Sequence, residues 1–378
     1  MKKQTRIFSA IVLVICLVGG FAYIQRKSDA DSGIVRIGGV FGLSGDVSSV
    51  SWGEAARNGT QLAIDDINAR GGIRGKKVEL ITEDMQSTSR GSVSAVSKLI
   101  NIDHVASIVG PTWLDVYQGA ADLIAEKNIV LISPDAGIEA VNGTKVHKNV
   151  FSAWYRTDVK AKLIAEYMAK HGVKRLAVML QNDAYYSDFS ARMSKYAALN
   201  GIEVVATELV NEATTDIRTP ALKLAAAKPD VIIFGLYDEK TIINFLNLHK
   251  DTFPKIALYG DEFVHDHYFK PEYQNLYEMA TYFHAAMPES DFVQRYKKRF
   301  GTEPEFGAGP AYDSTMIIAK MLEDEGLDSK GYDAYLRSHE FDTVSYGNMT
   351  FDAIGGVQSS NNQFDLWQIR NNKAIKVN

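Results

Sequence analysis

The sequence predicts an α/β protein of two lobes, each built on a doubly wound parallel sheet. The length of 378 residues exceeds one typical domain and suits two. Short apolar runs alternate with amphipathic segments, and this alternation starts afresh near Phe151. Apolar strands that are each followed by a crossover helix are typical of parallel sheets with helices on both faces.

The first series of elements begins at Ile34. Its expected strands are 34–41, 78–81, 105–109 and 129–132. Its expected helices are 52–70, 89–101 and 116–127. The first of these helices ends at Gly71-Gly72, a pair typical of a helix C-terminus.

The second series has a similar build, and we expect it to bury its own sheet. Its expected helices are 159–170, 189–200, 219–227 and 239–249, and its expected strands are 176–180, 203–207, 231–234 and 256–259. From about Met279 the sequence predicts helices 291–300 and 311–325, then β-like segments at 349–351 and 364–369. This last part is too short for a third domain, so we expect it to complete the first two.

The first thirty residues differ from the rest of the chain. Lys2, Lys3 and Arg6 precede an almost wholly apolar run at 7–24, a pattern typical of an export signal. The run is also long enough to stay in a membrane as an anchor, so a cleaved signal and a retained anchor both remain open. We therefore expect residues 1–30 to be a signal peptide or anchor. We expect the protein to work in the periplasm or at the outer face of the cytoplasmic membrane.

Composition excludes several classes of function. Cys16 is the only cysteine and lies in the apolar run, so the rest of the chain has no disulfide or thiolate metal site. The formal net charge is -5 and no basic stripe is visible, so nucleic acid is not an expected partner. No Gly-x-Ser-x-Gly elbow or Walker loop is present, and we expect neither catalysis nor a cofactor nor a metal.

A set of motifs in a fixed order carries a family resemblance. They are 38–45 (GGVFGLSG), Trp52-Gly53, Asn58-Gly59, 63–75 (AIDDINARGGIRG), 109–111 (VGP), 132–134 (ISP), 183–186 (DAYY), 229–233 (PDVII), 260–262 (GDE), 300–304 (FGTEP), Tyr312-Asp313 and 347–355 (GNMTFDAIG). Each motif is weak alone, and their order makes the set specific. The chain after residue 33 resembles the branched-chain amino-acid-binding proteins of ABC importers, in the periplasmic-binding-protein type I class.

The resemblance implies two lobes joined by three crossings of the chain. The first lobe would be 34–152 plus 284–345, and the second 153–283 plus 346–378. A small polar molecule, such as an amino acid, an amide or a related compound, would bind between lobes that close by a hinge motion. The implied partners are this ligand and an ABC permease with its ATPase, and we expect a monomer.

The winding itself predicts where a ligand binds, since ligands of open α/β sheets lie beyond the carboxyl ends of the strands. Those ends correspond to the turns at 42–52, 110–117, 133–137, 182–186, 235–238 and 260–263. The resemblance points to the same turns. It implies that Trp52 covers the ligand, Glu262 pairs with an ammonium group near Tyr186, and Tyr237 lines the cleft. Asp261 is the alternative to Glu262.

On the carboxylate side of the implied amino-acid site, this chain departs from the family. Leu114 stands where the family has a hydroxyl, and Gly137 stands where it has a threonine. Thr112 is close but shifted in register, and Asp135 would repel a carboxylate. The backbone N–H groups at 135–137 could still bind an anion.

The aromatic side chains Trp113 and Trp154 make this side more apolar. A compound with a cationic or amide group and an apolar body therefore fits as well as valine does. The candidate ligand-binding residues are Trp52, Thr112, Trp113, Asp135, Ala136, Gly137, Tyr186, Tyr237, Asp261 and Glu262.

Two alternative functions stay open. His265 and His267 flank Asp266 and could hold a metal or share proton transfer in a hydrolase, although the spacing matches no hydrolase motif. If residues 7–24 stay in the membrane, the same cleft could instead report its ligand to a membrane signalling partner.

Overall fold

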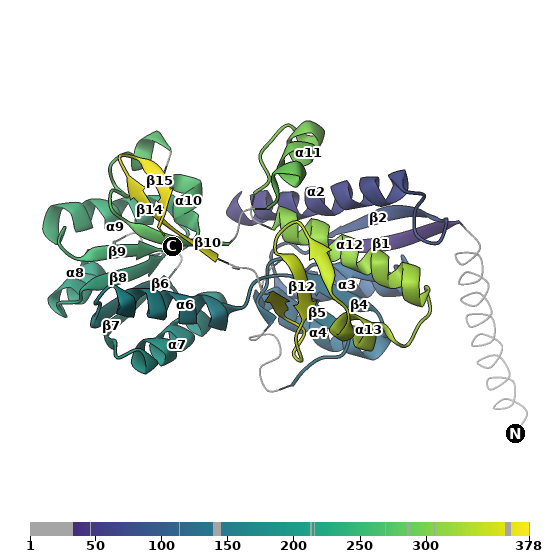
Figure 1. Ribbon diagram of the computed structural model, residues 1–378, viewed down its shortest axis with the longest axis horizontal. Helices are drawn as coiled ribbons and strands as arrows, with labels where there is room; N and C mark the ends of the chain where they lie inside the picture. Colours follow the sequence, from purple (N-terminus) through teal and green to yellow (C-terminus); the bar gives the residue numbers. More distant parts are fainter. Residues whose placement is uncertain are drawn as a thin grey trace, which may run out of the picture.

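A computed structural model describes residues 33–377, except 46, 113, 139–144, 212–213, 215, 269, 286–287, 306 and 360–363. The expected signal or anchor at 1–30 and the candidate residue Trp113 therefore lie outside the described residues. The described chain forms two lobes side by side (Figure 1). Within it, no helix combines the length and apolar character needed to cross a membrane.

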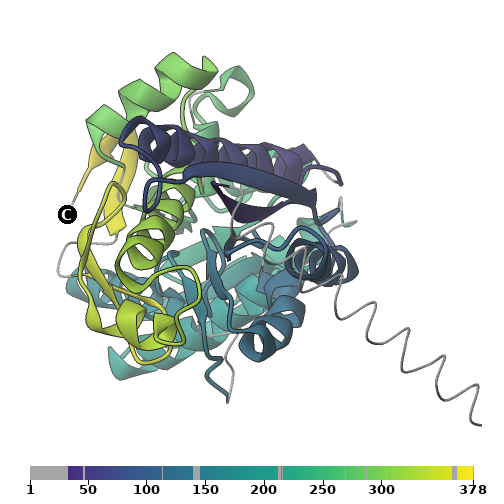
Figure 2. The ribbon, with the colours of Figure 1, turned by 90° about the vertical axis from the view of Figure 1, so that its right-hand side faces the viewer.

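The first lobe contains a five-stranded parallel sheet in the order β2-β1-β3-β4-β5. Its strands are β1 (Ile34–Phe41), β2 (Lys77–Asp84), β3 (Ser107–Val109), β4 (Val130–Ser133) and β5 (Val150–Ser152). Its helices are α2 (Val47–Ala69), α3 (Ser89–Asn101), α4 (Leu114–Lys127), α11 (Ser290–Phe300), α12 (Ala308–Glu325) and α13 (Tyr332–Ser338). Figure 2 looks onto this lobe, with α3 and α4 on one side and the segment from α12 onward on the other.

Alternation of side chains along the strands explains why both faces of this sheet are covered. Val109 and Ile132 share a core with α2 and α12. Ile108 and Leu131, each one residue earlier, share a core with α3 and α4. The apolar runs seen in the sequence are therefore strands buried on both faces.

The second lobe contains a seven-stranded sheet in the order β15-β14-β10-β9-β8-β6-β7. Its strands are β6 (Arg175–Gln181), β7 (Glu203–Val210), β8 (Val231–Gly235), β9 (Ala257–Gly260), β10 (Thr281–Ala285), β14 (Phe364–Arg370) and β15 (Lys373–Lys376). Its helices are α6 (Thr157–Lys170), α7 (Ala184–Leu199), α8 (Arg218–Ala226), α9 (Glu239–Thr252), α10 (Phe263–His267) and the 3-10 turn η1 (Pro271–Tyr273). Strands β6 to β10 are parallel, and β14 and β15 add an antiparallel edge.

The chain crosses from the first lobe to the second for the last time at a later residue than expected, because of a small antiparallel sheet. Strands β11 (Phe341–Thr343), β12 (Gly347–Phe351) and β13 (Val357–Ser359) pair with one another. Met349, Phe351 and Val357 lie in the core of the first lobe. The chain therefore returns to the second lobe between β13 and β14, and not near residue 345, because pairing within this sheet holds 341–359 together.

The two sheets share a change in strand order that marks the expected binding edge. In the first lobe the order reverses between β1 and β3, and in the second between β6 and β8. The turns that follow these strands carry Trp52 and Thr112 in one lobe, and Tyr186 and Tyr237 in the other. Such switch points are where open α/β sheets form ligand crevices.

The predicted fold class, two doubly wound parallel lobes, is confirmed. Helix α7 begins at Ala184, five residues before the expected start, because the Asp183 side chain caps it by accepting a hydrogen bond from Tyr186 N. Tyr186 therefore lies in the first turn of a helix. Strand β10 and the short helix α13 were not predicted, since their few residues carry too little periodicity.

The contact between α2 and α12 depends on a glycine. A Cβ atom at Gly59 would lie 2.0 Å from the carbonyl oxygen of Ala308, at the start of α12. The Asn58-Gly59 motif thus allows the two helix backbones to touch.

We expect Gly59→Ala to lower the free energy of unfolding by about 1–3 kcal/mol, because the methyl group overlaps the backbone of α12. Chemical denaturation measures this change. The control Ser94→Ala, on an exposed position of α3, should stay within about 0.5 kcal/mol of the wild type. An unchanged stability for Gly59→Ala would show that α12 shifts without cost.

Candidate ligand-binding site

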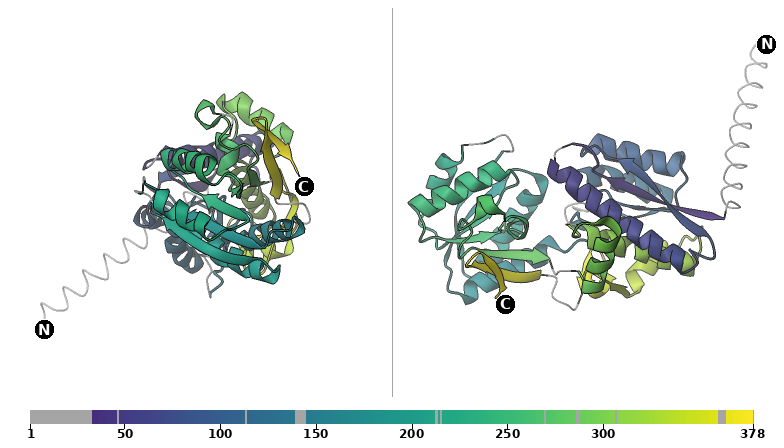
Figure 3. Two further views of the ribbon diagram at one scale, coloured as in Figure 1. Left: turned by 90° about the vertical axis from the view of Figure 1, so that its left-hand side faces the viewer. Right: turned by 90° about the horizontal axis from the view of Figure 1, so that it is seen from above.

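Aromatic side chains from both lobes meet where the lobes face each other. Trp52, in the first turns of α2, stacks on Phe263 of the second lobe with ring centroids 5.2 Å apart. The ring of Tyr237 stands edge-on to both, at 6.5 Å from Trp52 and 5.3 Å from Phe263. In the view from above, α2 begins at the side of the first lobe that faces the second (Figure 3). This contact spans the two lobes and excludes water from the space beneath it.

A glycine fixes the position of Trp52. A Cβ atom at Gly53 would lie 2.0 Å from the carbonyl oxygen of Gly42, in the turn after β1. The absence of a side chain lets α2 lie directly against this turn. The Trp52-Gly53 pair therefore couples an aromatic side chain to a backbone contact that positions it.

Glu262, the residue before Phe263, belongs to a buried group of charges. We call this group the lysine–acid cluster; its members are Tyr155, Lys160, Tyr185, Asp261 and Glu262. Lys160 Nζ forms an ion pair with Asp261 Oδ1 and lies 3.7 Å from Glu262 Oε2. It also donates to Tyr185 Oη at 3.0 Å. The Tyr155 hydroxyl donates to Glu262, at 2.6 Å from Oε2. The cluster joins the segment after β5, the starts of α6 and α7, and the turn after β9.

Burial of these charged side chains costs hydration free energy. The Lys160 side chain is 1% exposed and each acid side chain is 4% exposed, so all three charges have lost their hydration. A buried charge is tolerated when partners replace the lost water. Burial and the nearby acids also raise the pKa of Tyr155 and Tyr185 well above their usual values, so both phenols remain donors.

Two polar atoms next to the cluster have no hydrogen-bond partner among the described residues. They are Asp261 Oδ2 and the hydroxyl of Tyr186. The Tyr186 ring lies 5.4 Å from that of Tyr237, whose hydroxyl bonds to Asp183. The second lobe thus leaves one acceptor and one donor without a described partner, and the donor belongs to the ring next to Tyr237.

Asp135 is the corresponding feature of the first lobe. It follows β4, is 7% exposed, and neither carboxylate oxygen has a hydrogen-bond partner among the described groups. Burial raises the pKa of Asp135 well above its usual value. A carboxylate that is buried in this way destabilises the protein until a donor or cation reaches it.

The remaining predicted residues have other surroundings. Thr112 is fully buried and its hydroxyl lies 3.8 Å from Met85 Sδ, inside the first lobe, so it does not reach the space between the lobes. Ala136 is buried, and its N–H is already bonded to Ser133 Oγ at 3.2 Å. Gly137 is buried beside it. The hydroxyl and amide groups expected to hold an anion are therefore partly used within the lobe.

Sequence reasoning missed Tyr155, Lys160, Tyr185 and Phe263. Tyr155 lies three residues beyond β5, where the chain leaves the first lobe, and this position could have been found from the expected crossing. Lys160 gave no such signal, because a lysine in an amphipathic helix is normally on the surface. Tyr185 and Phe263 directly adjoin residues that were identified.

The histidine pair does not form a metal centre. His265 Nδ1 lies 2.9 Å from the Tyr282 hydroxyl, whereas the His267 ring stacks on Tyr273 at 5.0 Å. The two rings therefore belong to separate contacts. The described part of the chain contains no group of three or more His, Cys, Asp or Glu side chains that could hold a metal ion.

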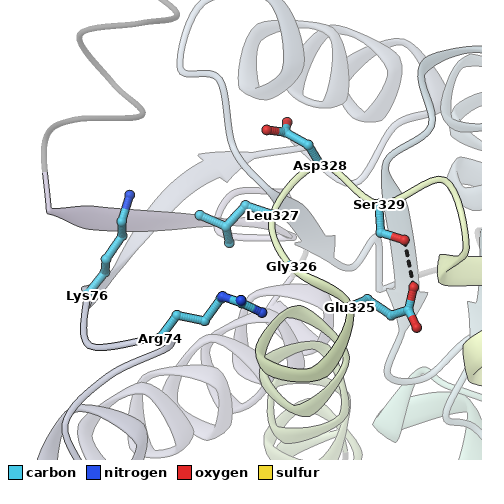
Figure 4. Close-up of a pocket in the computed structure, with 7 residues that line it drawn as sticks. All are labelled: Arg74, Lys76, Glu325, Gly326, Leu327, Asp328 and Ser329. Carbon is cyan, nitrogen blue, oxygen red and sulfur yellow. Dashed lines mark hydrogen bonds between the residues drawn. The ribbon is translucent and has the colours of Figure 1, made fainter.

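A surface hollow lies far from the space between the lobes. Figure 4 shows it between the turn of Arg74 and Lys76 and the loop 325–329 that follows α12. Arg74 Nη1 donates to Glu323 O at 2.8 Å, and Ser329 Oγ donates to Glu325 at 2.6 Å. The hollow is at the amino-terminal edge of β2, opposite the edge where the switch point lies. We assign no ligand to it.

Two doubly wound lobes that meet through aromatic side chains, with buried acids at the carboxyl ends of their strands, define a two-lobed solute-binding protein. The chain belongs to the periplasmic binding protein family, whose model matches residues 34–372. The family predicted from the sequence motifs is thereby confirmed.

Individual relatives agree with this assignment. The chain is 30% identical to the Leu/Ile/Val-binding protein BraC3 of Rhizobium johnstonii over 208 residues, 54% of each chain. It is 23% identical to a leucine-, isoleucine-, valine-, threonine- and alanine-binding protein of Pseudomonas aeruginosa over 95% of each chain. An R. palustris solute-binding protein in complex with benzoate superposes with a TM-score of 0.77 at 17% identity, over 91% of this chain and 95% of that one.

We expect Lys160→Met to lower the free energy of unfolding by about 3–5 kcal/mol, because Asp261 and Glu262 would stay buried without their cation. Urea denaturation at neutral pH measures the loss. The matched control is Lys162→Met on the same helix, where the side chain is 56% exposed and little change is expected. Equal stabilities of the two variants would contradict a structural role for Lys160.

His267 should make the stability depend on pH. Burial lowers the pKa of its imidazole from 6.5 to about 4. The unfolded chain therefore takes up a proton at higher pH than the folded chain. The free energy of unfolding should fall as pH drops through this window, by about 2 kcal/mol at about pH 5.

His267→Phe keeps a ring against Tyr273 and should remove its share of this dependence, in denaturation measured across the pH range. The rest comes from other histidines, among them His284, whose pKa burial lowers to about 3. Lys162→Met alters a surface charge but no histidine, and should keep the wild-type curve. A wild-type curve in His267→Phe would mean that other groups cause the acid sensitivity.

Proposed function

We propose that this protein is the extracytoplasmic receptor of an ABC importer, which closes around a small polar solute and delivers it to a permease and ATPase. The observation that carries the proposal is the stacking of Trp52 on Phe263 across the two lobes, where Phe263 directly follows the buried acids Asp261 and Glu262 in the sequence. Such a contact is made when the lobes approach, so it can couple ligand capture to closure. The amino-acid names of the relatives and the benzoate complex of a structural neighbour support a small organic ligand.

This function requires reversible binding without turnover. The apolar run at 7–24 supports export and, if it is retained, attachment at the outer face of the membrane. The expected monomer suits a receptor that docks as a single unit. A ligand-sensing subunit for a membrane signalling partner would use the same cleft, and neighbouring permease and ATPase genes would favour transport over sensing.

A thermal-shift screen of the purified chain tests the proposal. Its panel contains amino acids, amides, amines, aromatic acids and small peptides. A ligand at about 100 times its dissociation constant should add about 2.7 kcal/mol to the stability of the folded state. Small-angle scattering with the same ligand should report a more compact particle. A panel without any stabilising compound would contradict the receptor function.

Trp52→Ala should weaken the ligand found in this screen by at least about tenfold, because it removes the aromatic contact between the lobes. Titration calorimetry measures the affinity. The control Leu199→Ala removes an exposed apolar side chain at the end of α7 and should bind like the wild type. Unchanged affinity in Trp52→Ala would remove this residue from the site.

A further inference from the structure

Asp135 follows β4 at the carboxyl edge of the first sheet, the edge at which open α/β sheets bind ligands. A Cβ atom at Gly307, the residue before α12, would lie 3.3 Å from Asp135 Oδ2 and 3.9 Å from Ala56 Cβ. Ala56 follows Trp52 by one helical turn, so the two side chains share a face of α2. The Asp135 carboxyl group is therefore beside the amino-terminal end of α12, which also approaches the helix that carries Trp52.

This carboxylate takes the place that a ligand carboxylate would need. The amino-terminal end of a helix attracts an anion, and the chain places an acidic side chain of its own there. A ligand carboxylate brought to the same place would lie against the Asp135 carboxyl group, and two carboxyl groups at short range in a site with little water cannot both stay ionised. A cation or an N–H donor would instead satisfy two oxygens that have no described partner.

Lys160, the buried cation of the second lobe, is not available to a ligand carboxylate either. Lys160 Nζ is directed to Asp261, to the Tyr185 hydroxyl at 3.0 Å and to the Tyr155 hydroxyl at 3.5 Å, which uses the three donors of an ammonium group. The atoms left available are Asp261 Oδ2 and the Tyr186 hydroxyl. This end of the site also accepts a hydrogen bond more readily than it binds an anion.

We propose that the ligand carries a nitrogen donor at each end, as in a diamine or an amine bearing an amide, and has no carboxylate. One nitrogen would pair with Asp135 and the other with Asp261, while an apolar body lies against Trp52, Tyr237 and Phe263. This inference rests on the proposed function and specifies the chemistry of its site. It separates this chain from relatives named for amino acids and from the benzoate complex.

Matched compounds test the inference by titration calorimetry on the purified chain. One set is leucine, leucinamide and isopentylamine, another is benzoate, benzamide and benzylamine, and a third is 1,4-diaminobutane and 1,5-diaminopentane. We expect a diamine or amine-amide to bind, and each amide or amine to bind at least about tenfold tighter than its carboxylate. Tighter binding of leucine or benzoate would overturn the inference and leave the receptor function intact. Binding by no compound in this panel or in the wider screen would overturn both.

Variants of Asp135 give a second, independent test. Asp135→Asn should weaken the best amine by about tenfold or more while the protein remains folded by circular dichroism. Asp135→Ser removes the competing anion and should improve the affinity for leucine relative to the wild type. The control Asp122→Asn removes an equal charge from a side chain that is 71% exposed in the same lobe, and should leave both affinities unchanged. Unchanged amine binding in a folded Asp135→Asn would overturn the inference.

Discussion

The burial of the Lys160 ammonium is the interaction on which the rest of the candidate site depends. Once this charge has lost its water, Asp261 and Glu262 must lie beside it, and the hydroxyl groups of Tyr155 and Tyr185 complete its surroundings. These residues come from the hinge side of α6, from α7 and from the turn after β9. The acids are therefore held in place by the fold itself, and a ligand meets a surface that is already organised.

The two lobes contribute different chemistry to the space between them. The second lobe supplies the lysine–acid cluster with an acceptor and a donor left over. The first lobe supplies Trp52 and the carboxyl group of Asp135, which has no hydrogen-bond partner among the described residues. Buried charges determine which ligands are rejected as much as which are bound. The reason is that an unsatisfied buried polar group costs more free energy than a typical hydrogen bond contributes. A scaffold shared with amino-acid receptors can thus be given a different specificity by a few substitutions in the turns after β3 and β4.

The fold was predictable because its signal is repeated along the chain. Each strand–helix unit carries its own apolar run and helical periodicity, so small errors at the ends of elements do not change the topology. The third crossing was placed too early, since nothing in the local pattern at 346–359 shows that β12 and β13 pair with β11 and remain on the first lobe. Trp52, Tyr237 and Glu262 could be chosen from motifs and strand ends. Lys160 could not, because its burial depends on Asp261, which lies 101 residues away in the sequence.

The sequence by itself determined the alternation of strands and helices, the two lobes and the turns at which a ligand can bind. These properties follow from local periodicity and from the rule that parallel strands end at one edge of a sheet. Only the tertiary structure decided that the Thr112 hydroxyl lies inside the first lobe, that Lys160 neutralises the acids, and that Asp135 is buried with no partner in the part of the chain that the structure describes. The reason is physical: burial and pairing are properties of side chains brought together from distant segments, and no single segment contains them.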